Sequence, residues 1–266
     1  MQPIMGQPMM GGHAAPMMQR QVGWMPQPTN AKPGIPYGLE YLSELNGLII
    51  HQQHDFSEMF SDIENANVYH IYNNHMQLCY KAAETSNFCA RQCFGSRRQF
   101  TIHIKENNCR EVIRIHRKQA ILGFDEEITV TSGSTNELFG VIKSKKDVGF
   151  CNKGLFGRGC CKYPIYNLYD SKGMLIFELR GPEGGWCETC CQRDVEYPFM
   201  NLLGQKVGGV TKVYEGYKRD KHINGDKYGL HFPENLCVKL KASLLGAVFL
   251  MDFLYYESKS EMQPNE

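Results

Sequence analysis

The segment Val238–Tyr256 is the most apolar part of the chain, and it limits what the rest of the sequence can fold into. The seventeen residues from Leu240 to Tyr256 measure roughly 25 Å as a helix. A bilayer core is about 30 Å thick and asks for about twenty apolar residues. In this chain only Ala242–Met251 is free of charge before Asp252 follows. This length favours a helix buried in a protein core, and a short membrane span is the alternative.

Both environments suit the side chains of this predicted helix over 238–256. The segment is apolar on all sides, as a helix is when protein or lipid surrounds it. Two small residues, four positions apart, permit close approach of another backbone in either setting. If the helix spans a bilayer, the lysines before it and the acid-rich tail after it place the long N-terminal part in the cytosol. The residues that define the helix are Leu240, Ala242, Gly246, Phe249, Asp252 and Phe253.

The composition of residues 1–37 differs from that of the rest of the chain. This segment holds seven of the twelve prolines and seven of the thirteen methionines, with no Asp or Glu. Such a Met, Pro, Gly and Gln mixture cannot bury a core, so we predict a disordered tail that is available to protein partners. It lacks a basic start followed by an apolar stretch, so we expect no secretory signal and mostly reduced cysteines. The predicted folded domain covers residues 38–257, and 258–266 form a short polar tail.

Charge and motifs exclude several functions. The formal net charge is +1, which gives no electrostatic footprint for nucleic acid. The sequence contains no phosphate-binding Gly-rich loop, no G-x-S-x-G nucleophile motif and no H-E-x-x-H metal motif. We therefore do not predict an enzyme.

From Val68 onward the pattern is that of β-strands. Phe100, Ile102 and Ile104 alternate, a turn follows at Asn107–Asn108, and the apolar pattern returns at 112–115. Similar pairs of short strands continue along the chain and favour a barrel or a sandwich. A closed barrel leaves an interior that must be filled, and an all-round apolar helix of about fifteen residues would fill it. We therefore predict a mainly β fold, a closed barrel around the C-terminal helix.

The twelve residues 224–235 invite comparison with a calcium loop. An EF-hand loop places oxygen ligands at positions 1, 3, 5, 7, 9 and 12, with Gly at position 6. Gly229 falls at position 6, and the corresponding ligands are Asn224, Asp226, Tyr228, Leu230, Phe232 and Asn235. Few carboxylates imply weak Ca²⁺ affinity. The favoured alternative is a strand after an Asn-Gly turn, with its large apolar residues on one face.

The cysteines raise two questions, S-acylation and zinc binding. Cys160 and Cys161 follow an apolar and basic stretch that could touch a membrane, so they are candidates for S-acylation. Zinc is not expected, because only one C-x-x-C pair, Cys187 and Cys190, is present and no second pair lies at ribbon spacing.

Several of these segments together resemble the phospholipid scramblase family. The matching segments are Gly38–Leu42, Leu48–Gln53, Ala82–Glu84, Cys89–Gly95, Phe100–Thr101, Gly181–Pro182, Cys190–Cys191, Asp194–Val195, Tyr228–Pro233, Val238–Ala242, Gly246–Phe253 and Glu257. The resemblance implies ATP-independent, Ca²⁺-activated movement of phospholipids, a calcium loop, palmitoylated cysteines and one C-terminal transmembrane helix. It also implies a Tubby-like barrel of about twelve strands around a buried C-terminal helix.

This chain departs from the family in two places. The family's calcium loop is acidic at its first and last positions, where this chain has Asn224 and Asn235. The family's run of five cysteines would fall near Lys118–Phe124, which contains no cysteine.

The expected function is phospholipid scrambling at the cytosolic face of a membrane, and the plasma membrane is the favoured location. If the C-terminal helix spans the bilayer, the protein has single-pass type II topology. The alternative is a soluble or lipid-anchored barrel that binds lipid headgroups or protein partners without transporting lipid.

Overall fold

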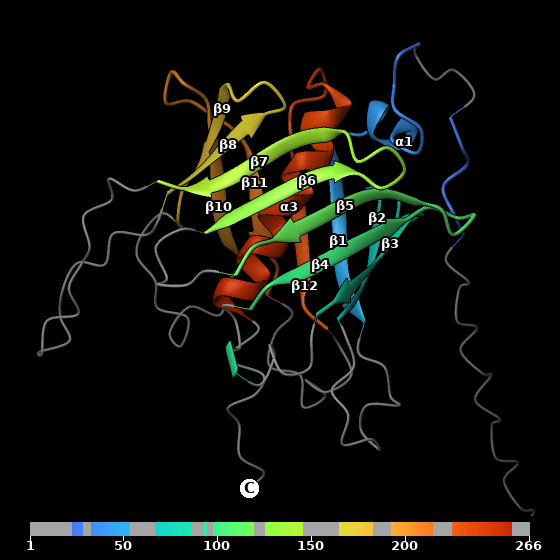
Figure 1. Ribbon diagram of the computed structural model, residues 1–266, viewed down its shortest axis with the longest axis horizontal. Helices are drawn as coiled ribbons and strands as arrows, with labels where there is room; N and C mark the ends of the chain where they lie inside the picture. Colours follow the sequence, from blue (N-terminus) through green and yellow to red (C-terminus); the bar gives the residue numbers. More distant parts are fainter. Residues whose placement is uncertain are drawn as a thin grey trace, which may run out of the picture.

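A closed β-barrel forms the body of the protein in a computed structural model (Figure 1). The structure describes residues 23–28, 33–53, 67–86, 93–94, 98–119, 126–145, 165–182, 193–214 and 225–256. Within these residues twelve antiparallel strands occur: β1 Gly47–Gln53, β2 Val68–Tyr72, β3 Leu78–Thr85, β4 Phe100–Lys105, β5 Glu111–Arg117, β6 Glu127–Ser132, β7 Leu138–Ser144, β8 Tyr166–Asp170, β9 Leu175–Leu179, β10 Val195–Met200, β11 Lys206–Lys212 and β12 Lys227–His231. The prediction of a mainly β closed barrel is confirmed.

Each strand pairs with its neighbours in the sequence, and β1 pairs with β12 to close the barrel. The closing register runs from Gly47 opposite His231 to His51 opposite Lys227. Each of the twelve described strands therefore has a neighbour on both sides, although β9 and β10 are joined by only two residue pairs, Phe199 with Leu179 and Met200 with Glu178. The predicted alternation is also present, because Phe100, Ile102 and Ile104 of β4 are buried while the residues between them are only partly buried.

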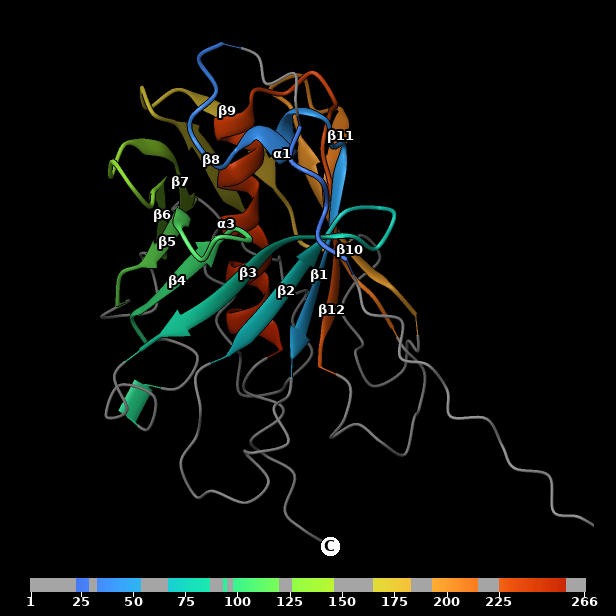
Figure 2. The same cartoon turned by 90° about the vertical axis from the view of Figure 1, so that its right-hand side faces the viewer.

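The helix α3, Val238–Tyr255, occupies the interior of the barrel (Figures 1 and 2). Every residue from Lys241 to Phe253 is buried. Gly246 brings the helix backbone close to the wall, since a Cβ there would lie only 3.0 Å from Val130 and 3.2 Å from Ile142. The predicted hydrophobic helix is therefore the core of the barrel. In the part of the chain that the structure describes, no helix combines the length and the apolar character needed to cross a bilayer.

The alternating strand directions give the barrel two different ends. The end at which α3 begins carries the short hairpins of β2–β3, β4–β5, β6–β7, β8–β9 and β10–β11, and we call it the hairpin end. The short helix α1, Glu40–Ser43, lies against α3 at this end. At the opposite end α3 finishes, and there the strands change direction through longer connections.

Part of the segment predicted as a tail lies against the barrel. Trp24 forms a bridge with Leu78 at the start of β3, and the Met25 amide donates to the Leu78 carbonyl at 2.8 Å. Met25 also packs against the core.

The predicted boundary near Gly38 coincides with a tight contact, because a Cβ at this position, where φ is +81°, would overlap Val112.

Candidate functional site

Asp252, near the end of α3, is the centre of a buried polar cluster. Its Oδ2 accepts a hydrogen bond from the Tyr69 hydroxyl, and its Oδ1 accepts one from the Tyr228 hydroxyl, both at 2.6 Å. Tyr69 belongs to β2 and Tyr228 to β12, the two strands that flank β1. The carboxyl group therefore ties the helix to the seam at which the barrel closes.

Burial governs the ionisation of this group. Burial and the neighbouring Asp226 raise the pKa of Asp252 to about 6, although Lys212 and the two phenols act in the opposite direction. The pKa of Tyr228 is raised well above its ordinary value by burial and by the Asp252 charge. At pH 7 the carboxylate is mostly ionised, so the two phenols donate their protons to it.

Lys212, at the end of β11, lies beside the aromatic rings that surround the Asp252 carboxyl group. Its ammonium lies 4.4 Å from the ring centre of Tyr228 and 4.8 Å from that of Tyr256, within the range of cation–π attraction. The same ammonium forms an ion pair with Asp226. Lys212 is opposite Tyr228 in the β11–β12 register, so both side chains turn toward the interior.

Two further ion pairs surround the last turns of α3. Arg98 binds Glu84 at 2.8 Å, and its guanidinium lies 4.8 Å from the ring centre of Phe253. Arg117 binds Glu126 at 2.6 Å. Both pairs are almost fully buried, so each charge depends on its partner, because burying one alone is costly.

We call these residues together the polar cluster. Its members are Tyr69, Glu84, Arg98, Arg117, Glu126, Lys212, Asp226, Tyr228, Asp252 and Tyr256. The cluster holds cations that suit phosphate oxygens, and carboxylates and aromatic faces that suit an ammonium group. Because its charges are paired within the protein, a ligand would have to replace one of the partners.

Lys241 anchors the other end of α3. The sequence suggested that this lysine precedes the apolar helix as a flanking charge, but it is completely buried. Its ammonium donates to the carbonyls of Leu42, Leu45 and Glu234 at 3.0, 2.7 and 2.8 Å. Lysine is tolerated inside the barrel because three carbonyl oxygens replace its water.

The remaining predicted helix residues are packing residues. Phe249 meets Tyr69 edge to face at 5.0 Å between ring centres, and Phe253 stacks on Phe100 at 3.9 Å. Ala242 is fully buried, whereas Leu240 is only partly buried. The structure thus brings Phe249, Asp252 and Phe253 into or beside the polar cluster.

The segment predicted as a calcium loop is mostly strand. Its candidate ligands within the described residues are Asp226, Tyr228, Leu230, Phe232 and Asn235, while Asn224 lies outside them. β12 takes up Lys227–His231, and its backbone pairs with β1 on one side and β11 on the other. The predicted alternative, a strand with one buried face, is what the structure shows.

The side chains of this segment serve other partners. The Asp226 carboxylate pairs with Lys212, and the Tyr228 hydroxyl donates to Asp252. Across the described ranges, no group of three or more His, Cys, Asp or Glu side chains could hold a metal ion. These donors do not fit a calcium loop, and calcium binding by the chain stays a prediction. The acylation candidates Cys160 and Cys161 lie outside the described residues.

Most members of the polar cluster were not identified from the sequence. The signal that could have found them is strand alternation: Tyr69 is two residues from the buried Ile71, and Arg117 is two residues from the buried Ile115. Residues at this spacing share one face of a strand. A polar residue in phase with buried apolar ones is therefore a candidate for the barrel interior.

Comparison with known proteins gives one consistent result. The family model described as Scramblase matches residues 25–258. The chain is 33% identical over 238 residues to phospholipid scramblase 2 from Homo sapiens, covering 89% of this chain and 75% of that protein. It is 31% identical over 249 residues to human phospholipid scramblase 1, covering 91% and 72%. It is 30% identical over 243 residues to human phospholipid scramblase family member 5, covering 88% and 83%. No solved structure matches the chain.

Proposed function

Since the chain belongs to the scramblase family, we propose that it moves phospholipids between the two leaflets of a membrane, in both directions and without ATP. The observation that carries the proposal is the extent of the family match. Residues 25–258 include all twelve described strands and α3, so the similarity concerns the complete barrel with its central helix. The relatives cited above are named phospholipid scramblases, and about 30% identity extends over most of this chain.

The polar cluster supports this proposal through its chemistry. A phospholipid headgroup carries a phosphate and often an ammonium group. Lys212 and Arg98 carry charges that suit a phosphate group, which would have to replace their partners Asp226 and Glu84. The rings of Tyr228 and Tyr256 already hold a cation. We propose this end of the barrel as the place where a headgroup would be held.

Movement of a headgroup requires protection from hydrocarbon, because each unsatisfied polar group in lipid costs several kcal/mol. The interior of the barrel is filled by α3, whose residues 241–253 are buried. The proposed route therefore runs along the protein surface, with the bilayer thinned beside it or with a second copy completing the path.

Calcium has no assigned step in this proposal. The described residues of 224–235 belong to β12 and its flanks, and Asp226 is already paired with Lys212. The family resemblance alone supports three further parts of the proposal. These are stimulation by Ca²⁺, acylation of Cys160 and Cys161, and residence at the cytosolic face of the plasma membrane.

The test is a flipping assay with the purified full chain in vesicles that contain a fluorescent phospholipid. Dithionite quenches only the outer leaflet, so lipid movement appears as quenching beyond one half of the fluorescence. We expect this extra quenching without ATP, and the assay is repeated with Ca²⁺ and with a chelator. Quenching that stays at one half in both would reject scrambling; an equal rate in both would reject only calcium stimulation.

A second function, binding of lipid headgroups without transport, is favoured by one observation. Both ends of α3 are bonded to the rest of the protein: Lys241 donates to the Leu45 carbonyl beside α1, and Asp252 accepts from Tyr69 in the barrel wall, which favours a helix that stays in place. Vesicle binding with no lipid movement would support this second function over the first.

A further inference from the structure

Five neighbouring strands carry a line of basic side chains across the outer face of the barrel. In the strand registers, each of these residues lies directly opposite the next, from β12 through β1, β2 and β3 to β4. We call them the basic row: Lys227, His51, His70, Lys81 and Lys105. At about 4.8 Å between strands the row extends for about 19 Å. Figure 2 shows these strands side by side.

Such an arrangement costs stability, because like charges directly opposite on neighbouring strands repel each other. Lys81 and Lys105 form such a pair, and both side chains are exposed. These five strands contain a single acidic residue, Glu84, which is buried and bound to Arg98. The outward-facing residues of these strands therefore carry an excess of positive charge.

Lysines on β7 and β11 form ion pairs with acids, whereas Lys81 and Lys105 face each other across β3 and β4. On β7 and β11, Lys143 binds Glu127 at 3.0 Å and Lys206 binds Glu196 at 2.6 Å. The basic row itself stops at β5, where Lys105 faces Glu111 in the register. The excess of positive charge is therefore concentrated on one part of the wall.

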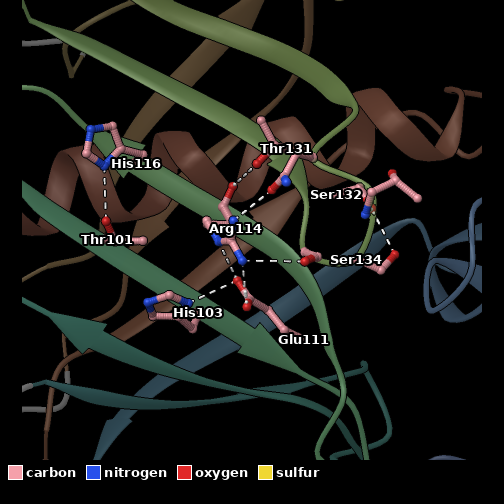
Figure 3. A network of polar contacts seen from close by, with 11 residues as sticks. Thr101, His103, Glu111, Arg114, His116, Thr131, Ser132 and Ser134 are labelled. Carbon is pink, nitrogen blue, oxygen red and sulfur yellow. Dashed lines mark hydrogen bonds and ion pairs between the residues drawn. The ribbon is translucent and has the colours of Figure 1, made fainter.

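The boundary at β5 is a network of polar side chains (Figure 3). Glu111 accepts hydrogen bonds from Arg114 at 2.8 and 3.0 Å, and His103 lies 2.9 Å from it. Burial opposes ionisation, yet these hydrogen bonds hold the pKa of Glu111 below its usual range. The acid at this boundary is thus ionised and occupied by its own cations.

Aromatic side chains accompany the basic row. The Lys81 ammonium lies 5.7 Å from the Trp24 ring centre, and the Tyr72 hydroxyl lies 3.2 Å from the ring nitrogen of His70. Trp and Tyr favour the interface between lipid and water, and lysines are attracted to anionic lipid surfaces. The five strands contain no arginine, the residue that best reads phosphates of nucleic acid by bidentate contacts.

We propose that the basic row docks the protein onto an anionic phospholipid surface, with the outer face of β12, β1, β2, β3 and β4 laid against the headgroups. The inference deepens the proposed function and rests on it, since a protein that moves lipids must first meet a bilayer. It assigns this contact to lysines on the wall of the barrel.

The test measures co-sedimentation of the full chain with phosphatidylcholine vesicles that contain or lack phosphatidylserine. Each lysine near an anionic surface contributes about a fivefold factor in affinity, so the double variant Lys81→Gln/Lys105→Gln should bind about 25-fold more weakly. The matched control is Lys143→Gln/Lys206→Gln, which removes two lysines that are paired with acids and should change affinity by less than about twofold. Circular dichroism establishes that both double variants are folded.

Several results would overturn the inference. These are equal binding to both kinds of vesicle, an equal loss in the two double variants, or binding of duplex DNA through Lys81 and Lys105 with no binding of vesicles. The flipping assay separates this proposal from the proposed function. If no variant moves lipid but docking follows the basic row, only scrambling fails; if lipid moves and docking ignores the row, only the docking face fails.

Discussion

The substitution Asp252→Asn tests the energetic role of the buried carboxyl group. Asparagine has nearly the same shape and keeps an oxygen acceptor for one of the phenols of Tyr69 and Tyr228, but it carries no charge at any pH. In the wild-type protein, burial and Asp226 raise the pKa of Asp252 from 3.8 to about 6, against the opposing effect of Lys212. The folded protein therefore binds a proton that the unfolded chain has already released.

The sign and the size of the effect follow from this difference. Between pH 4 and pH 6 the folded state holds more protons than the unfolded state, so the free energy of unfolding falls as the pH rises through this window. A rise from 3.8 to about 6 corresponds to about 3 kcal/mol lost by pH 7. The amide of the variant does not titrate and has no such dependence. Relative to the wild type, the variant should therefore gain about 2–3 kcal/mol between pH 4 and pH 7, because at pH 4 the unfolded carboxyl group is already partly ionised.

Urea unfolding of both proteins across this pH range measures the difference. The control is Glu196→Gln, which removes an exposed carboxylate from the outer pair with Lys206 and should follow the wild-type curve closely. If the curves of the wild type and Asp252→Asn stay parallel from pH 4 to pH 7, the carboxyl group does not titrate in the folded protein as argued.

Two more substitutions test the buried charges. Arg117→Met leaves Glu126 without its guanidinium partner and should lower the free energy of unfolding by about 3–5 kcal/mol, measured by urea unfolding. Adding Glu126→Leu should restore most of the lost stability. A double variant as unstable as the single variant would contradict this. Lys241→Met removes the donor to three carbonyls and should lower the free energy of unfolding by about 2–4 kcal/mol, measured by urea unfolding. Amide hydrogen exchange near α1 should also become faster. Unchanged stability would show that the ammonium is dispensable.

The fold could largely be predicted from local patterns. The alternation of Phe100, Ile102 and Ile104 became the inward face of β4, and the all-round apolar run near the C-terminus became the enclosed helix. These patterns are informative because each strand has one face on the core, while a helix inside a barrel has all faces on it. The helix ends at Tyr255, one residue before the predicted end.

The polar cluster could not be assembled in the same way, because its contacts depend on strand register. Asp252 was conspicuous as a charge in an apolar segment, but its partner Tyr69 lies 183 positions earlier. The pairing of Lys212 with Asp226 likewise follows from the position of β11 beside β12. Sequence spacing suggested a calcium ligand at Asp226, whereas the three-dimensional arrangement gives that carboxylate a lysine.

The two polar residues of α3 constrain how the protein can act on lipids. Lys241 is bonded to the carbonyls of Leu42 and Leu45, and Asp252 is bonded to two phenols of the barrel wall. Moving α3 into a bilayer would break both sets of bonds and expose the apolar lining that surrounds the helix. Hydrogen bonds to charged groups contribute about 1.5–3 kcal/mol each, so these bonds alone oppose the movement by several kcal/mol. A mechanism that keeps α3 in place and uses the outer wall avoids this cost, which is why we assign membrane contact to the basic row and not to the helix.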